Sequence, residues 1–151
     1  MKFENYRIQP EVKRAIAEEG FKKPTDIQYK VIPKVLAGED LLAIAQTGTG
    51  KTAAFVIPIL HLLAKEKKSK LLRCLVMVPT HELAQQIGDV FKSLGKHIRL
   101  KILSLFGSTD QDPQIKALQQ GVDILVTTPG RMFDLSAQGY IDFRQIQCLV
   151  L

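Results

Sequence analysis

LLAIAQTGTGKTAAFV, residues 41–56, contains the strongest structural signal in this chain. Its apolar start at residues 41–45 predicts a buried β-strand, and the run that begins at Ala53 predicts a helix. Between them, Gly48 and Gly50 allow the backbone to curl so that successive amide hydrogens point into one concavity. The start of the helix adds its positive dipole end. Strand, glycine-rich loop and helix in this order predict a phosphate-binding loop in an α/β domain.

Two side chains at the end of this loop can supply its chemistry. Lys51 can reach the terminal phosphates of a nucleotide, and the Thr52 hydroxyl can ligate a magnesium ion. We therefore predict Lys51 and Thr52 as the catalytic residues, with Thr52 as the metal ligand. Ala45 stands where the usual pattern has glycine, so the interpretation depends on Gly50 and the two residues after it. A glycine-rich turn with a capping threonine is the alternative, which the flanking strand and helix disfavour.

The rest of the chain alternates short apolar runs with amphipathic stretches punctuated by proline and glycine. This pattern is typical of a parallel sheet with crossover helices. With 151 residues, 46% of them hydrophobic, the chain can bury one core. The strand candidates are rich in Val, Ile and Leu and cover residues 41–45, 72–78, 99–106, 124–127 and 148–151. We predict one α/β domain with a mostly parallel sheet and helices on both faces.

Helix ends are marked by proline, threonine and glycine. Pro10 suits the first turn of a helix that ends before Gly20, and Thr25 can cap a second helix that closes at Gly38. Apolar residues recur at helical spacing over 83–94, Asp112-Pro113 opens another helix closed by Gly121, and a short helix begins near Gly130. Pro33 and Pro58 should bend the helices that contain them.

Charge, cysteine content and the absence of long apolar segments indicate which partners and which cellular compartment to expect. A net charge of +6 and a pI near 9.4 favour an anionic partner such as nucleic acid, although a basic surface can also serve solubility alone. Cys74 and Cys148 lie in apolar runs without metal-ligand neighbours, which predicts buried reduced thiols. The start of the chain does not look like a signal peptide, and no segment is long enough to span a bilayer. We predict a cytoplasmic protein without a membrane partner.

The segment at residues 20–28 has two interpretations. In the first, Thr25 and Gln28 form a capping box at a helix start. In the second, the Gln28 amide offers a donor and an acceptor to the amino group and N7 of adenine, while Phe21 lies against the base. Both interpretations hold if the helix start faces the nucleotide.

With these residues in view, the chain resembles the DEAD-box RNA helicases along nearly its whole length. Residues 20–28 look like the Q motif of that family, Phe3 stands near its isolated upstream aromatic, and residues 45–52 look like motif I. The resemblance implies a RecA-like fold, ATP and Mg²⁺ as cofactors, and ATP-dependent RNA helicase activity. It also implies the nucleotide-binding residues Phe21, Thr25, Gln28, Ala45, Gln46, Thr47, Gly48, Thr49, Gly50, Lys51 and Thr52.

Three later segments resemble the RNA-binding motifs of the family, namely motif Ia at residues 79–86, the glycine pair at 106–108 and motif Ib at 128–131. Each follows a strand expected to run parallel to residues 41–45, which places it at the carboxyl edge of the sheet. Threonine caps, free amides and an arginine fork suit phosphate oxygens, so we expect contacts with the RNA backbone that do not depend on base sequence. For residues 128–131 taken alone, an ordinary helix cap is the alternative interpretation. The predicted RNA-binding residues are Pro79, Thr80, His81, Gly107, Ser108, Thr128, Pro129, Gly130 and Arg131.

Two residues depart from the family pattern. His81 replaces the usual arginine, so a permanent charge gives way to a group that is mostly neutral near pH 7, and we predict a weaker or pH-sensitive RNA contact. Ser108 replaces the second glycine of the pair and adds a side chain where the family brings its backbone close to RNA.

The last residues, 147–151, look like the strand that precedes the Asp-Glu-Ala-Asp motif in this family. We therefore expect an N-terminal helical segment with the Q motif at residues 1–40 and a partial first RecA-like domain at 41–151, incomplete at its C-terminal end, with the second RecA-like domain absent. Such a chain should bind nucleotide without hydrolysing it or unwinding RNA. It lacks the family strand that lies between the phosphate-loop strand and the last strand, so it should be weakly stable or self-associate through unpaired sheet edges.

Two rivals stay open. Another phosphate-loop ATPase would share Gly50-Lys51-Thr52 but has no reason to carry residues 21–28 and 128–131. A non-catalytic RNA-binding module is the second, and ATPase measurements distinguish it from the helicase.

Overall fold

The computed structural model describes residues 1–66, 70–107 and 110–151, so the predicted RNA-binding residue Ser108 lies outside the described residues. The chain forms two compact units. The first contains residues 1–66 and 90–99, and the second contains residues 67–89 and 100–151. In the part of the chain that the structure describes, no helix is long and apolar enough to cross a membrane.

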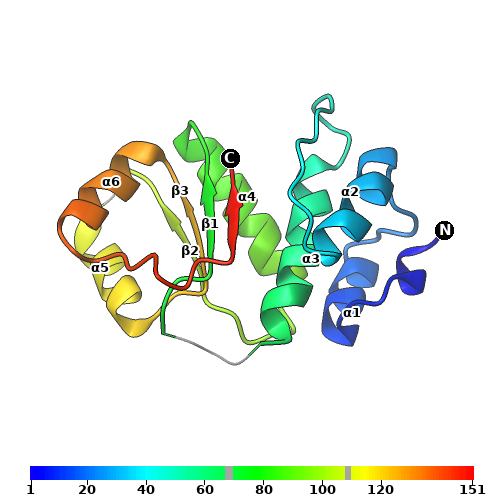
Figure 1. The fold of residues 1–151 in the computed structure, drawn as a ribbon, viewed down its shortest axis with the longest axis horizontal. Helices are drawn as coiled ribbons and strands as arrows, with labels where there is room; N and C mark the ends of the chain where they lie inside the picture. Colours follow the sequence, from blue (N-terminus) through cyan, green and yellow to red (C-terminus); the bar gives the residue numbers. More distant parts are fainter. Residues whose placement is uncertain (67–69, 108–109) are drawn as a thin grey trace. The chain divides into compact units, whose positions relative to one another are not determined.

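The second unit is built on a four-stranded sheet with the order β2-β3-β1-β4. All described strand pairs are parallel, as predicted (Figure 1). In the register of β1, Cys74 lies opposite Ile124 of β3 and Cys148 of β4. Every residue of the inner strand β3 is buried, which explains its unbroken apolar sequence. The strands are β1 (Cys74–Met77), β2 (Ile102–Leu105), β3 (Ile124–Thr127) and β4 (Cys148–Val150).

Helices cover both faces of this sheet. On one face, α5 (Gln111–Gln120) and α6 (Pro129–Ala137) contribute to an apolar core with the strands. On the other face, the Ser104 hydroxyl on β2 donates to the Ala84 carbonyl of α4 (His81–Leu94) at 3.3 Å. A Cβ on Gly88 would collide with the same hydroxyl, so glycine allows α4 to approach the sheet. The core residues are Leu72, Leu75, Leu105, Val122, Leu125, Met132, Leu135 and Ile141.

A buried ion pair joins the amino ends of three strands. Arg73 precedes β1, and its guanidinium donates to the Asp123 carboxylate, which precedes β3, at 2.8 Å. The second oxygen of Asp123 accepts from the backbone amide of Lys101, which precedes β2, also at 2.8 Å. The side chains of Arg73 and Asp123 are only 2% and 8% exposed. If one partner were removed, water could not solvate the charge of the other.

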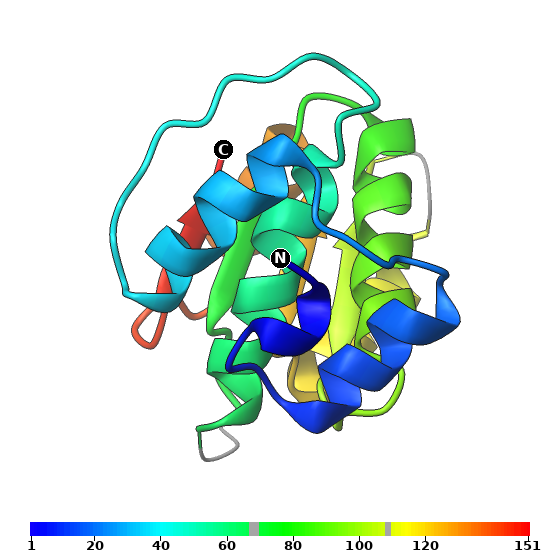
Figure 2. The same ribbon diagram turned by 90° about the vertical axis from the view of Figure 1, so that its right-hand side faces the viewer.

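The first unit is helical, with η1 (Phe3–Asn5), α1 (Pro10–Glu18), α2 (Asp26–Leu36) and α3 (Lys51–Ala64) (Figure 2). The predicted helix ends are confirmed: Pro10 begins α1, Thr25 caps α2, and Gly20 and Gly38 follow with positive φ angles of 80° and 78°. Nine of the 14 residues of α3 are buried. Its His61 Nδ1 accepts from the amide of Gln9, and burial lowers the pKa of this imidazole.

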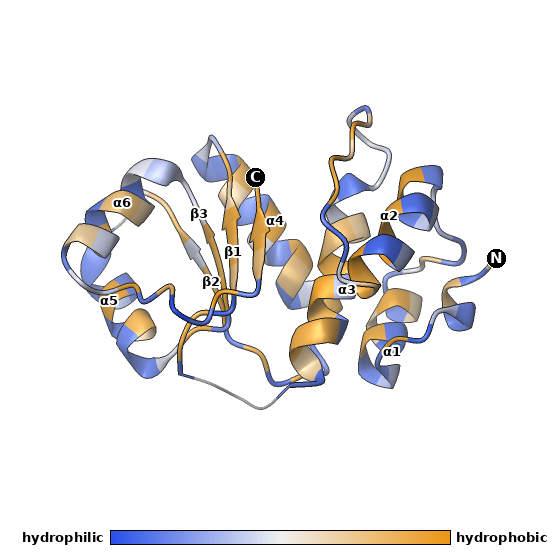
Figure 3. Cartoon of the chain, in the orientation of Figure 1, coloured by the Kyte–Doolittle hydropathy of each residue, from blue (hydrophilic) through white to orange (hydrophobic). Residues whose placement is uncertain are grey.

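The predicted strand at residues 41–45 is wrong. The backbone there forms no strand, and the Leu42 and Ile44 side chains are 88% and 87% exposed. Figure 3 shows this hydrophobic run in an extended connection between α2 and α3. A strand needs a hydrogen-bonded neighbour, and none of the described strands pairs with these residues. The described residues therefore contain four of the five expected strands.

Smaller differences concern one cysteine and one helix boundary. Cys74 is buried as predicted, and its pKa is raised by a hydrogen bond with Cys148 and by burial. Cys148 is only half-buried because β4 is an outer strand of the described sheet. Helix α5 begins one residue earlier than Asp112, since the Asp110 carboxylate caps it by accepting from the Asp112 amide at 3.1 Å.

A charged cluster fixes the end of α1 in the first unit. The Glu18 carboxylate lies 2.8 Å from Lys96 Nζ and 2.9 Å from His97 Nε2, and Glu19 accepts from the Ser93 hydroxyl. The hydrogen bonds to Lys96 and His97 lower the pKa of Glu18 to about 2. Glu18 therefore favours the folded state in its ionised form.

We expect Glu18→Gln to lower the melting temperature at neutral pH, and the difference from the wild type to shrink as the pH falls from about 4.5 toward 2. The sign follows from the lowered pKa, because the unfolded chain binds the proton first and the stabilisation is lost on acidification. Thermal melts at several pH values measure this effect. Glu39→Gln, which breaks an exposed pair with Lys34 alone, is the control and should have a smaller effect at pH 7. A pH-independent difference would contradict the prediction.

Candidate nucleotide and RNA sites

The Q-motif segment and the phosphate loop meet in the first unit. Gln28 Nε2 donates to the Gly50 carbonyl at 3.2 Å. The same side chain forms the predicted capping box, since its Oε1 accepts from the Thr25 amide at 3.0 Å while the Gln28 amide donates to the Thr25 hydroxyl at 3.4 Å. Gly50 has a φ angle of 84°, which other residues rarely adopt, and a Cβ there would also displace Gln28 Nε2, so the position favours glycine. Residues 22 positions apart are thereby joined.

Gln28 keeps hydrogen-bonding capacity after these contacts. A glutamine amide has two N–H donors and a carbonyl oxygen with two lone pairs. The Gly50 carbonyl uses one of the donors, and the Thr25 amide uses one of the lone pairs. One donor and one acceptor are left, which is the pair that the N7 and amino group of adenine require. The capping and adenine-reading interpretations are therefore compatible.

The phosphate loop has the curled backbone that its glycines predict. Gly48 and Gly50 have φ angles of 80° and 84°, in the left-handed region, and α3 begins immediately at Lys51. The Thr49 hydroxyl donates to the Gln46 carbonyl at 2.7 Å and closes the turn. The loop residues Gln46, Thr47, Gly48 and Lys51 are exposed, whereas Ala45, Thr49, Gly50 and Thr52 are half-buried. The start of α3 thus presents amides, an ammonium group and a hydroxyl together.

Aromatic rings pack around Phe21, at the start of the Q-motif segment. Phe21 is 43% exposed, and its ring centroid lies 6.4 Å from that of the buried Phe3. Phe3 in turn lies 6.2 Å from Tyr6, whose hydroxyl is buried. Phe21 therefore combines a packed edge with an exposed surface on which a base can lie.

In the second unit, the described residues of the three predicted RNA-binding segments lie at the carboxyl ends of adjacent strands. Parallel pairing of β2, β3 and β1 places the loops after them at one edge of the sheet. The Thr128 amide donates to the Leu105 carbonyl at 3.3 Å, and the Val78 amide donates to the Thr127 carbonyl at 3.0 Å. The sheet therefore assembles a surface from segments that are far apart in sequence.

The predicted threonine caps have different outcomes. The Thr80 hydroxyl accepts from the Leu83 amide at 3.2 Å, so this cap is confirmed. Thr128 occupies the cap position of α6, but its side chain makes no capping bond, and that prediction is wrong. Its backbone is extended and the residue is buried beside β2, so the position is set by the sheet. Pro129 and Gly130 are exposed at the start of α6.

Side chains connect the loops with one another. The ring centroid of the exposed His81 lies 5.7 Å from that of Phe106, in an edge-on arrangement. Arg131 Nη2 donates to the Gly107 carbonyl at 3.0 Å, and Nη1 donates to Gln111 Oε1 at 3.4 Å. The contributions of Phe106 and Gln111 were missed in the sequence because only the fold brings them beside His81 and Arg131.

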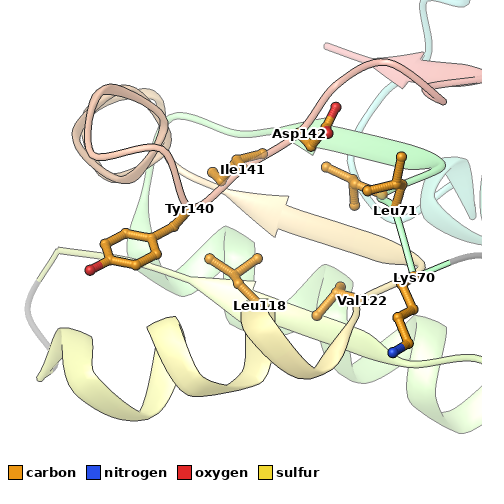
Figure 4. A pocket seen from close by; sticks show the side chains of 8 residues that line it. Lys70, Leu71, Leu118, Val122, Tyr140, Ile141 and Asp142 are labelled. Atoms are coloured by element: carbon orange, nitrogen blue, oxygen red, sulfur yellow. The ribbon is translucent and has the colours of Figure 1, made fainter.

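A shallow hollow lies at the opposite, amino end of the strands. Figure 4 shows its apolar wall, which includes Leu118, Val122 and Ile141, with Lys70 and Asp142 at the rim. None of the predicted site residues lines it.

A profile of the DEAD/DEAH box helicase family matches residues 25–151. The chain belongs to this family. Over 149 residues it is 45% identical to a putative ATP-dependent RNA helicase, ste13, of Schizosaccharomyces pombe, covering 99% of this chain and 30% of that protein. It is 43% identical over 151 residues to the ATP-dependent RNA helicase dhh1 of Aspergillus clavatus, covering 100% of this chain and 30% of that protein.

Solved structures support the same fold. A DEAD box protein from the hyperthermophile Methanococcus jannaschii superposes with a TM-score of 0.88 at 38% identity, covering 97% of this chain and 39% of that one. A hypothetical ATP-dependent RNA helicase from Sulfolobus tokodaii gives 0.85 at 35% identity, with 94% and 40% covered. The RecA-like α/β fold predicted from the sequence is confirmed. The chain spans about 30% of the length of the curated helicases it matches.

Proposed function

We propose that this chain is the ATP- and RNA-binding part of the first RecA-like domain of a DEAD-box ATP-dependent RNA helicase. The observation that carries this proposal is the bond from Gln28 to Gly50, because it joins an adenine-reading group to a phosphate-binding loop. Another phosphate-loop ATPase has no need for this contact or for the three loops at the edge of the sheet. The relatives named as ATP-dependent RNA helicases support the same activity.

In the nucleotide half, Phe21 and Gln28 bind the base while the backbone of residues 46–50 and the start of α3 bind the phosphates. Lys51 would neutralise charge on the terminal phosphates, and the Thr52 hydroxyl would hold Mg²⁺. When bound, Mg²⁺ would supply further charge neutralisation to the phosphates. The hydroxyl and ammonium groups fit this role because both lie in the first turn of α3.

In the RNA half, one edge of the sheet carries the exposed residues Pro79, Thr80, Gly107, Pro129 and Gly130. Amides and carbonyls recognise the sugar-phosphate chain without reading bases. We infer an RNA partner bound largely independently of sequence. Self-association of the 151-residue chain and a cytoplasmic location stay predictions.

RNA-stimulated ATPase activity tests the proposal. The full-length protein should hydrolyse ATP faster with single-stranded RNA, whereas the 151-residue chain should bind a fluorescent ATP analogue without turnover. Absence of adenine-nucleotide binding in both would overturn the helicase assignment. RNA binding without ATPase activity in the full-length protein would instead favour a non-catalytic RNA-binding module.

His81→Arg should tighten RNA binding of the full-length protein at neutral pH several-fold. His81 is exposed at the first position of α4 beside Phe106, so an arginine there can reach phosphate while its stem packs on the ring. Fluorescence anisotropy with labelled single-stranded RNA measures the affinity. His81→Gln, which adds no charge, is the control. Unchanged affinity in the arginine variant would reject a role for charge at this position.

A further inference from the structure

The Arg131 side chain is engaged with the loop that follows β2. Its side chain is only 9% exposed. One guanidinium nitrogen donates to the Gly107 carbonyl at 3.0 Å, and the other terminal nitrogen donates to Gln111 Oε1 at 3.4 Å and lies 3.9 Å from the Asp134 carboxylate. The planar fork therefore hydrogen-bonds the loop and the first residue of α5, and it lies near a carboxylate of its own helix.

These contacts determine how Gly107 is presented. Its carbonyl is held by Arg131, while a Cβ added to it would meet no atom within 4 Å. The backbone of Gly107 is thus fixed on one side and open on the other, so an RNA strand can approach it closely. A lysine cannot replace this arrangement, because a single ammonium group lacks the rigid fork that binds two oxygens at fixed positions.

We propose that Arg131 is a positioning residue for RNA, which acts by holding Gly107 in place and not by neutralising a phosphate. The inference rests on the proposed RNA-binding function and refines the role of one residue in it. Exposed arginines in basic loops usually contact phosphate directly, but this guanidinium is largely covered and already bonded within the protein.

Salt dependence separates the two roles. Each phosphate neutralised in single-stranded nucleic acid releases counterions and contributes roughly 0.7 to the slope of log affinity against log salt concentration. A positioning arginine contributes nothing to this slope. If Gly107 is no longer held in place, one hydrogen bond between its backbone and RNA is lost, which corresponds to about a tenfold change in affinity. Arg131→Lys should therefore weaken RNA binding about tenfold with the slope unchanged. A phosphate-binding arginine would tolerate lysine and lose slope only in Arg131→Gln.

The experiment uses the full-length protein, a labelled oligouridylate and a non-hydrolysable ATP analogue over a range of salt concentrations. Gln111→Ala should weaken RNA binding in the same direction, and the Arg131→Lys, Gln111→Ala double variant should lose less than the sum of the single losses. Arg144→Lys is the matched control, since the Arg144 side chain is 80% exposed and forms its ion pair with Asp142. ATP affinity and melting temperature should stay near wild-type values in Arg131→Lys.

Three results would overturn the inference. They are full RNA affinity in Arg131→Lys, a reduced salt slope in Arg131→Gln, and a parallel loss of ATP affinity and melting temperature, which would indicate a general structural role. Each of these leaves the proposed function intact if the wild type binds RNA. If the wild type fails to bind RNA, the proposed function fails first and the role of Arg131 falls with it.

Discussion

Lys51→Ala should weaken ATP binding of the full-length protein by roughly 10- to 100-fold and abolish RNA-stimulated hydrolysis. Lys51 is exposed at the first position of α3, directly after the left-handed Gly50, so its ammonium group is free to reach the terminal phosphates. Removing one charge-assisted hydrogen bond costs about 1.5–3 kcal/mol, and about 1.4 kcal/mol corresponds to a tenfold change in affinity. Titration with a fluorescent ATP analogue measures the loss.

Lys65→Ala is the control for this change. Lys65 caps the opposite end of the same helix and is also exposed, so its removal changes the net charge equally without touching the loop. It should leave ATP affinity nearly unchanged. Equal ATP affinity of the wild type and Lys51→Ala would show that residues 46–52 do not bind phosphates, and the proposed function would be lost.

Asp123→Ala should lower the melting temperature by about 10 °C. The change removes both hydrogen bonds of the Asp123 carboxylate and leaves the Arg73 guanidinium, whose side chain is 2% exposed, buried without its counter-charge. Breaking one partner of a buried ion pair costs about 3–5 kcal/mol. In a chain of this size each kcal/mol shifts the melting temperature by about 2–4 °C. Thermal unfolding followed by circular dichroism measures the shift.

Asp142→Ala is the matched control. Asp142 and Arg144 form a shorter ion pair, at 2.6 Å, but the Arg144 side chain is 80% exposed. Solvent screening makes such a pair nearly neutral for stability, so the melting temperature should change little. Equal losses in the two variants would mean that burial of the Arg73 pair does not stabilise the amino ends of the strands.

Local features of the fold were predictable because neighbouring residues specify them. Pro10, Thr25 and Gly38 mark helix ends through their own backbone preferences, and the structure places those ends as predicted. The unbroken apolar run of β3 likewise required burial on both faces. The prediction of a strand at residues 41–45 rested on the same kind of apolar run and was wrong. An apolar run becomes a strand only when another strand is available to pair with it.

The same distinction between local and tertiary features applies to the candidate sites. Sequence alone determined which groups are available: the phosphate loop with Lys51 and Thr52, the Gln28 amide, and the polar residues after three strands. Only the tertiary structure decided that Gln28 bonds to Gly50 and that Arg131 holds Gly107, across separations of 22 and 24 residues. The physical reason is that caps and turns depend on adjacent residues, whereas a hydrogen bond between distant segments depends on how sheets and helices bring them together.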